Sequence, residues 1–186
     1  MRLFIHTSLL NTKKRAWSAA FLFAGVILTA TPFVRPVVGF LREHHLLLLT
    51  VTALFFLSFT YIFLYFIQQV RLSKRAYGAI FFLLFLTAML TFKERMIEER
   101  IHLLEFALLS LLFYKACWHT FKKPILLFGL PFLLATLLGC IDETWQGILP
   151  DRFFDVRDIF DNMLGAFIGT GLAFIRNLFG NFNQNP

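Results

Sequence analysis

Long apolar runs recur along this chain, and each is separated from the next by a short stretch that carries charge. A transmembrane α-helix needs on the order of 20 mostly apolar residues, which is close to the length of these runs. We therefore predict six membrane spans, at about 17–33, 46–67, 76–92, 101–118, 124–141 and 158–175. Thr31-Pro32 is expected to end the first span, with Pro36 reinforcing the stop, because the residue before a proline is biased away from helix.

The composition favours the same class of protein. Of the 186 residues, 58% are hydrophobic, only 16% carry a charge, and 26 are Phe. A soluble domain of this size would not cover its surface with so few charges. We expect an all-α, polytopic transmembrane helical bundle of about six spans, in which residues 1–186 form a single membrane domain.

The basic residues predict an orientation rather than a nucleic-acid partner. The net charge is +7, but Lys and Arg occupy the short connections between the spans, where they meet anionic headgroups. More of the 18 basic residues fall on the side of the two termini than on the other side. We therefore expect both termini in the cytoplasm and a multi-pass location in the cell (inner) membrane. The apolar run after Lys13, Lys14 and Arg15 is interpreted as an uncleaved first span.

Acidic residues concentrate in one late stretch of the chain. More than half of the 11 Asp and Glu lie between residues 140 and 171: Asp142, Glu143, Asp151, Asp155, Asp158 and Asp161. Because the fourth and fifth spans form one helical hairpin, residues 93–105 and 142–162 are predicted on one membrane face, away from the cytoplasm. Acid at the edge of the lipid is costly unless it is paired, hydrated or bound to a cation. We therefore expect the two stretches to meet and to form the site.

In the last predicted helix, Asp155, Asp158 and Asn162 share a narrow stripe, because their i, i+3, i+7 spacing follows the helical repeat. Gly165 and Gly169 continue this stripe in a pattern typical of close helix packing. Two interpretations of the two Asp residues remain open, namely capping of the helix start and binding of a divalent cation.

Two further groups of polar residues are candidates. At the predicted end of the fifth span, Asp142 and Glu143 oppose the helix dipole, with Gln146 one turn beyond. This placement predicts a positive partner: Arg100, Arg152, Arg157 or a metal ion. It leaves open whether the two carboxylates belong to a structural ion-pair network or act as base or cation ligand. His102 and Glu105, three residues apart on the fourth span, can share one face and one proton.

These residues form two extended motifs. The first reads Glu99-Arg100-x-His102-x-x-Glu105-Phe106, followed by a Leu-rich run. The second reads Asp142-Glu143-x-x-Gln146, then Pro150-x-Arg152-x-x-Asp155-x-x-Asp158-x-x-x-Asn162-x-x-Gly165-x-x-x-Gly169. Together, within about residues 93–176, they resemble the two signatures of the VanZ-like membrane proteins. Phe106 departs from the family pattern, where Tyr is common, and so does Asp151, where Gly is common.

The family is named for a protein linked to teicoplanin resistance. The resemblance therefore implies a cell-envelope role where the outward face of the cell membrane meets water, and an effect on glycopeptide antibiotic susceptibility. The candidates for catalysis are His102, Glu105, Asp142 and Glu143. The candidates for binding an anionic substrate are Arg100, Gln146, Arg152 and Asn162, and those for a divalent cation are Asp155 and Asp158.

Two functions fit these observations. The first is a membrane-embedded enzyme or substrate-handling protein that acts on a lipid-linked cell-wall or surface-glycan intermediate. The second is a non-catalytic envelope scaffold or partner-docking protein, whose charged cluster is a structural lock. Ion transport would need polar residues through the full depth of the bilayer, and spans 46–67 and 76–92 have almost none. The expected partners are membrane lipids and a lipid-linked glycan or cell-wall precursor, and whether the chain is an enzyme stays open.

Overall fold

The computed structural model describes residues 10, 12–54, 56–57, 60, 74–93, 99–150 and 152–179. Its long helices are α1 (Lys13–Glu43), α3 (Lys74–Lys93), α4 (Glu99–Trp118), α5 (Pro124–Ile148) and α6 (Val156–Phe179). Every regular element in these described ranges is a helix, and α1, α4, α5 and α6 are each long and apolar enough to cross a membrane. The prediction of an all-α membrane protein is confirmed.

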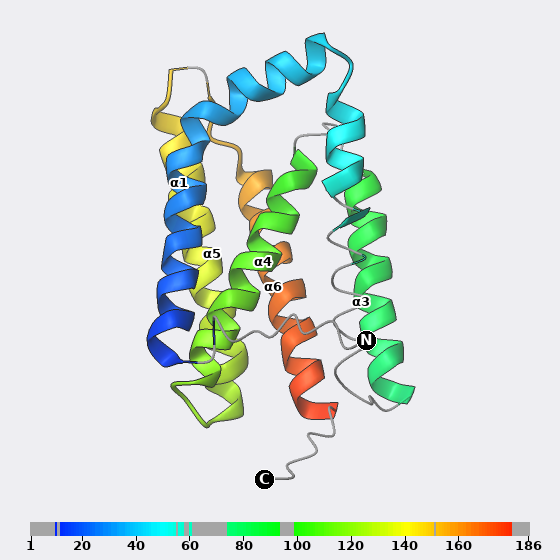
Figure 1. The fold of residues 1–186 in the computed structure, drawn as a ribbon, viewed down its shortest axis with the longest axis vertical. Coiled ribbons are helices and arrows are strands. Elements are labelled where there is room, and N and C mark those ends of the chain that lie inside the picture. The colour runs from blue at the N-terminus through cyan, green and yellow to red at the C-terminus, as the bar shows by residue number, and fades with distance from the viewer. Residues whose placement is uncertain are drawn as a thin grey trace, which may run out of the picture.

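The helices are arranged around a central pair, α4 and α6 (Figure 1). α4 packs most extensively against α6, and α5 packs against both of them. α1 covers α4 and α5 on one side of the pair, whereas α3 contacts α6 on the other side. The central pair is therefore the part of the bundle on which the other described helices are assembled.

Two glycines explain why α4 and α6 lie so close together. A Cβ atom added to Gly165 would collide with the backbone carbonyl oxygen of Leu103. A Cβ atom added to Gly169 would collide with the carbonyl oxygen of Ala107 and with the hydroxyl of Ser110. Small residues at this spacing let two helix backbones touch, which in lipid replaces the hydrophobic force that holds soluble bundles together.

α1 joins this pair through a stripe of small residues. Ala16, Ala20 and Ala24 are buried at a spacing of four residues, one helical turn apart. Ala20 and Ala24 pack in one cluster with the large buried side chains of Phe106 and Phe113 from α4. The same stripe continues along α1 through two further buried residues, Ile27 and Thr31.

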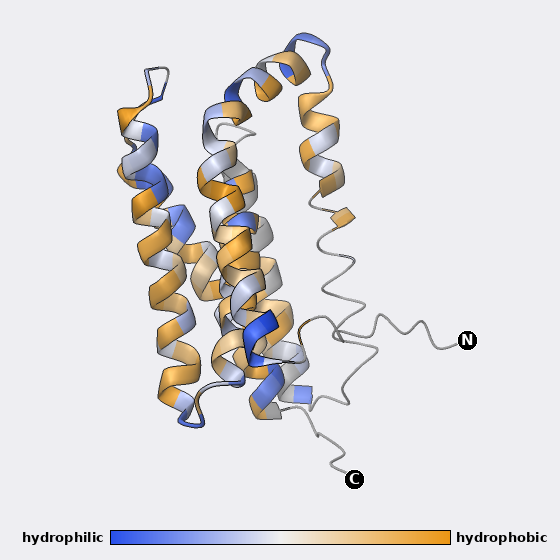
Figure 2. Ribbon diagram, turned by 60° about the vertical axis from the view of Figure 1, so that its left-hand side comes forward, coloured by the Kyte–Doolittle hydropathy of each residue, from blue (hydrophilic) through white to orange (hydrophobic). Residues whose placement is uncertain are grey.

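The outer surface of the bundle is apolar over most of its length. Large side chains such as Phe81, Phe85, Leu133 and Leu137 are exposed on α3 and α5. Figure 2 shows hydrophobic residues along the helices, with hydrophilic residues gathered mainly at helix ends and connections. Contiguous apolar surface of this kind is expected where helices contact lipid rather than water.

The first predicted span ends too early. α1 continues through Pro32 and Pro36 to Glu43, so most of the stretch between the first two predicted spans is helical. Figure 1 shows α1 rising along the bundle and then bending across its upper end. A proline inside a helix lacks the N–H that bonds four residues back, and its ring crowds that turn, so it bends a helix without necessarily ending it.

The fifth predicted span also ends too early. It was expected to stop near residue 141, but α5 continues to Ile148. Asp142, Glu143 and Gln146 therefore lie inside a helix and are buried there, rather than at its emerging end. The dipole argument for a positive partner does not apply to side chains in this position. The second predicted span, 46–67, is helical over 47–54, and most of its remainder lies outside the described residues.

The order of the helices brings the two polar stretches to one end of the bundle. In Figure 1 the start of α4, the end of α5 and the start of α6 all lie at the upper end, near the bend of α1. α1 begins, and α6 ends, at the opposite end. For the described residues, the prediction that 93–105 and 142–162 share one end is confirmed.

Candidate functional site

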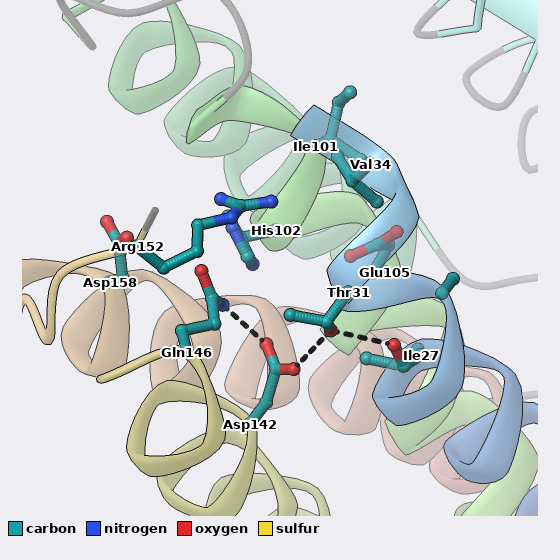
Figure 3. Close-up of a pocket in the computed structure, with 11 residues that line it drawn as sticks. Ile27, Thr31, Val34, Ile101, His102, Glu105, Asp142, Gln146, Arg152 and Asp158 are labelled. Atoms are coloured by element: carbon teal, nitrogen blue, oxygen red, sulfur yellow. Dashed lines mark hydrogen bonds between the residues drawn. The ribbon is translucent and has the colours of Figure 1, made fainter. Parts of the chain in front are cut away.

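A cavity of about 170 Å³ lies at this end of the bundle, between α1, α4, α5 and the start of α6 (Figure 3). Six of the residues predicted for the site line it: His102, Glu105, Asp142, Gln146, Arg152 and Asp158. The other lining residues are Ile27, Ala30, Thr31, Val34 and Ile101. The two polar stretches, which are some 40 residues apart in the chain, thus meet around one space.

Asp142 is a buried carboxylate of the cavity that has two side-chain hydrogen-bond partners. Its side chain, in α5, is only 1% exposed. Its Oδ2 accepts a hydrogen bond of 2.9 Å from Nε2 of Gln146, one turn further along the same helix. Its Oδ1 lies 2.8 Å from the hydroxyl oxygen of Thr31 in α1. Both described partners of this buried acid are therefore neutral groups.

Thr31 has one hydroxyl hydrogen and two oxygen atoms within reach. Its Oγ1 lies 2.9 Å from the carbonyl oxygen of Ile27 and 2.8 Å from Oδ1 of Asp142. Asp142 and the carbonyl oxygen share that hydrogen, because a hydroxyl is a single donor. Thr31 therefore links α1 to α5 through Asp142.

Thr31 is a site residue that sequence analysis missed, because the Thr31-Pro32 pair was interpreted as the end of a span. The signal that could have identified it is the stripe of buried residues on α1, which places Thr31 on the same face as Ala24 and Ile27. A polar side chain on a helix face that packs against the bundle needs a hydrogen-bond partner there.

His102 and Glu105 enter the cavity from α4, as their three-residue spacing predicts. Glu105 lies six residues after Glu99, the first residue of α4, so it is about 9 Å along the helix axis from the start of the helix. In Figure 3 the side chain of Arg152 extends toward His102. Nδ1 of His102 and Nε of Arg152 are buried and have no hydrogen-bond partner among the described residues. These two nitrogens are available to a bound ligand or to water.

Glu143 and Asn162 do not line the cavity. Both are fully buried, with 0% of each side chain exposed. Oε1 of Glu143 accepts a 2.6 Å hydrogen bond from the backbone N–H of Asp155. Asn162 packs against Gly139: a Cβ atom added to Gly139 would lie 2.8 Å from the Cβ atom of Asn162. Both side chains therefore sit in the contact between α5 and α6. Their predicted roles in catalysis and substrate binding gain no direct geometric support.

Asp155 and Asp158 have different surroundings. Asp155 precedes α6 and caps it: Oδ1 accepts 2.8 Å from the backbone N–H of Arg157, and Oδ2 pairs with its guanidinium at 3.0 Å. These bonds, the backbone one above all, hold the pKa of Asp155 below its ordinary value. Asp158 lines the cavity, and Asp155 does not. Among the described residues, no group of three or more His, Cys, Asp or Glu is arranged to hold a metal ion.

Arg152 lines a second cavity as well as the first. This second cavity, of about 410 Å³, lies between the bend of α1 and the connection after α5. Its lining residues are Thr31, Pro32, Arg35, Pro36, Leu149, Pro150 and Arg152. Thr31 and Arg152 border both spaces, so the two cavities adjoin. The side chain of Arg100, the other predicted anion-binding arginine, lies outside the described part of the structure.

The fold and the site define an integral membrane helical protein with a cavity of ionisable residues at one end of its bundle. The VanZ/LLP1 family model matches residues 20–177, which is most of the chain, and the chain belongs to that family. The resemblance in the two polar motifs is thereby confirmed. Comparison with curated proteins found no match, and comparison with solved structures found none.

Proposed function

We propose that the 170 Å³ cavity is the working site of a membrane protein that handles a lipid-linked intermediate of the cell envelope. The observation that supports this is the position of half-buried Glu105 and buried Asp142 beside His102 and Arg152 in one cavity. Ionisable side chains at the edge of a membrane bundle are costly and therefore rare unless they serve a function. Here carboxylates from three helices, α4, α5 and α6, face a common space together with the guanidinium group of Arg152.

The chemistry of the lining divides into two parts. Asp142, with Thr31 beside it, and Glu105, with His102 on the same helix, are groups that can accept or donate a proton. Arg152 can bind an anionic oxygen, because a guanidinium presents several donors in a planar fork. Proton transfer next to a bound anion is the combination needed to process a phosphorylated or carboxylated headgroup.

The size of the cavity limits what can enter it. A cavity of roughly 150 Å³ admits a molecule as large as benzene. At about 170 Å³, this one can hold the reacting polar group of a substrate but not a whole lipid-linked glycan. The rest of the substrate would lie in the adjoining second cavity or in the bilayer.

The basic residues Lys13, Lys14 and Arg15 support an outward-facing site. They lie where α1 begins, at the end of the bundle opposite the cavity (Figure 1). Because Lys and Arg accumulate on the cytoplasmic side, the cavity would face away from the cytoplasm, in the cell (inner) membrane. From that face it would have access to cell-wall intermediates and would affect susceptibility to glycopeptide antibiotics such as teicoplanin.

A specific observation favours the alternative of a structural lock. Asp142 connects α1 to α5, since its two oxygens bond Thr31 of α1 and Gln146 of α5. In a non-catalytic scaffold, this link would hold α1 in place for docking a partner, and the cavity would have no substrate.

Single amide substitutions distinguish the two functions. Glu105→Gln, Asp142→Asn and Asp158→Asn each keep the shape of the side chain and remove the carboxylate. Each variant is produced in a strain that lacks its own copy, and both folded yield in detergent and teicoplanin susceptibility are measured. Glu43→Gln is the matched control, because Glu43 is exposed at the end of α1 and lines neither cavity.

We expect near-normal folded yield for the three cavity variants, together with loss of the effect on susceptibility, and no change for Glu43→Gln. If folded yield and phenotype fall in parallel, the cluster is a structural lock. If all three variants fold and retain the phenotype, the cavity is not the working site.

A further inference from the structure

The second cavity differs from the first in its charge. Its polar lining consists of Thr31, Arg35 and Arg152, and none of the described residues that line it is acidic. Two guanidinium groups that border one space repel each other unless an anion lies between them. By contrast, the first cavity contains three carboxylates, those of Glu105, Asp142 and Asp158.

The bend of α1 is what places Arg35 on this cavity. Pro32 lies three residues before Arg35 and Pro36 directly after it, and both prolines line the second cavity. A straight α1 would continue past the end of α5, whereas the bent helix crosses the upper end of the bundle (Figure 1). Arg35 thereby comes to border the same space as Arg152, which lies after α5 and more than 100 residues away in the chain.

Arg152 also carries a donor that the described residues do not use. Its Nε is buried and has no hydrogen-bond partner among them. A buried donor without a partner costs free energy, so such a group is normally bonded to water, to an ion or to a ligand. Arginine is suited to phosphate in particular, because its planar donors match two phosphate oxygens at once.

The location of the cavity indicates how a phosphate group would reach it. The part of α1 after the bend exposes Phe33, Val37 and Phe40, which are large apolar side chains on a helix that also carries Arg35 and Arg42. A helix segment that combines exposed apolar and basic residues at the end of a membrane bundle is expected to lie at the headgroup level. Lipid phosphates occupy that level.

We propose that Arg35 and Arg152 form a binding site for a phosphate group that is attached to a membrane lipid. This inference rests on the proposed function and specifies the substrate's anionic group. Because Thr31 and Arg152 border both cavities, a phosphate held in the second cavity places the adjoining part of the substrate next to Asp142 and Glu105.

The test measures binding by the purified full-length protein in detergent, by calorimetry. The probes are farnesyl phosphate, farnesol, which has the same chain without the phosphate, and inorganic phosphate, which has no chain. The variants are Arg35→Gln and Arg35→Lys. Arg42→Gln is the matched control, because Arg42 is an exposed arginine of the same helix that does not line the cavity.

We expect the wild-type protein to bind farnesyl phosphate more tightly than farnesol, and more tightly than inorganic phosphate. Arg35→Gln should weaken the binding of farnesyl phosphate by about tenfold, the effect of losing one charged hydrogen bond. Arg35→Lys should restore part of the affinity, since it keeps the charge but loses the planar fork. Arg42→Gln should bind as the wild type does. If inorganic phosphate binds as tightly as farnesyl phosphate, the site takes free phosphate and the lipid part of the proposal is wrong.

Two outcomes would overturn the proposal as a whole: equal affinity for farnesol and farnesyl phosphate, or equal losses in Arg35→Gln and Arg42→Gln. A failure of the proposed function can be distinguished from a failure of this phosphate site. In the first case, Glu105→Gln would keep the effect on teicoplanin susceptibility, while the binding of farnesyl phosphate would still depend on Arg35.

Discussion

The α4–α6 contact below the cavity and the α1–α5 contact beside it differ in what fills the space between the helices. Gly165 and Gly169 bring the backbone of α6 against that of α4, so no room remains between them. At the upper end, α1 and α5 are joined by the hydrogen bond between Thr31 and Asp142, and a cavity adjoins that bond. One contact is made by close packing, and the other by a polar bond next to open space.

This difference separates stability from function within one small bundle. Close backbone packing has a single geometry, because a glycine contact cannot be repacked by a change of rotamer. A helix that is bent at a proline and held by a few hydrogen bonds leaves space at its end for a ligand. We therefore expect substitutions at the first contact to act on folding, and those at the second to act less on folding and also on binding.

The largest effect on folding is expected at the two glycines. Gly165→Ala and Gly169→Ala each place a methyl group against backbone atoms of α4 and should lower the free energy of unfolding by about 1–3 kcal/mol. Thermal unfolding in detergent measures this. Gly129→Ala is the control, because an added Cβ there meets nothing within 4 Å. If Gly129→Ala were equally destabilising, the close contact would not be the cause.

A smaller effect is expected at Thr31. Thr31→Val keeps the shape of the side chain but leaves a buried oxygen of Asp142 without its donor, so the free energy of unfolding should fall by about 1–2 kcal/mol. Thr31→Ser retains the hydroxyl and should be closer to wild type. Chemical unfolding of the three proteins side by side gives the comparison. An unchanged stability in Thr31→Val would mean that α1 is held by apolar packing alone.

The smallest effect is expected at Asp155, which belongs to neither contact. Asp155→Ala removes the cap of α6 and should cost about 0.5–1 kcal/mol. Because the pKa of Asp155 is lowered in the folded protein, its contribution is full above the ordinary value of 3.8 and is lost as the pH falls through the lowered value. The difference in unfolding temperature between wild type and variant should therefore narrow in acid. A constant difference across that pH range would contradict the assigned cap.

The sequence predicted the described helices with differing accuracy. α3 and α4 begin and end within two residues of the predicted spans, because charged connectors bound their apolar runs. α1 and α5 extend well beyond the predicted ends. In these two helices, polar residues and prolines do not mark a boundary. A neighbouring helix can provide hydrogen bonds to the polar residues and to the backbone groups that a proline leaves unbonded, so the helix continues.

The site was predictable in its location but not in its full membership. Spacing alone placed His102 and Glu105 on one helix face, and the hairpin of α4 and α5 carried them to the end where Asp142 and Asp158 lie. Spacing did not show that Glu143, next to Asp142, points into the α5–α6 contact. Adjacent residues on a helix point about 100° apart, so only the positions of neighbouring helices decide which one meets a cavity.

The amino-acid sequence by itself determined the all-α membrane class, the family and the end of the bundle at which the polar stretches meet. Apolar run length and connector order suffice for the class and for the shared end, and the two polar motifs suffice for the family. Only the tertiary structure decided that Thr31 and Arg35 belong beside the acidic stretch. Their placement depends on how far α1 bends at its prolines, and that bend is set by the helices against which α1 packs.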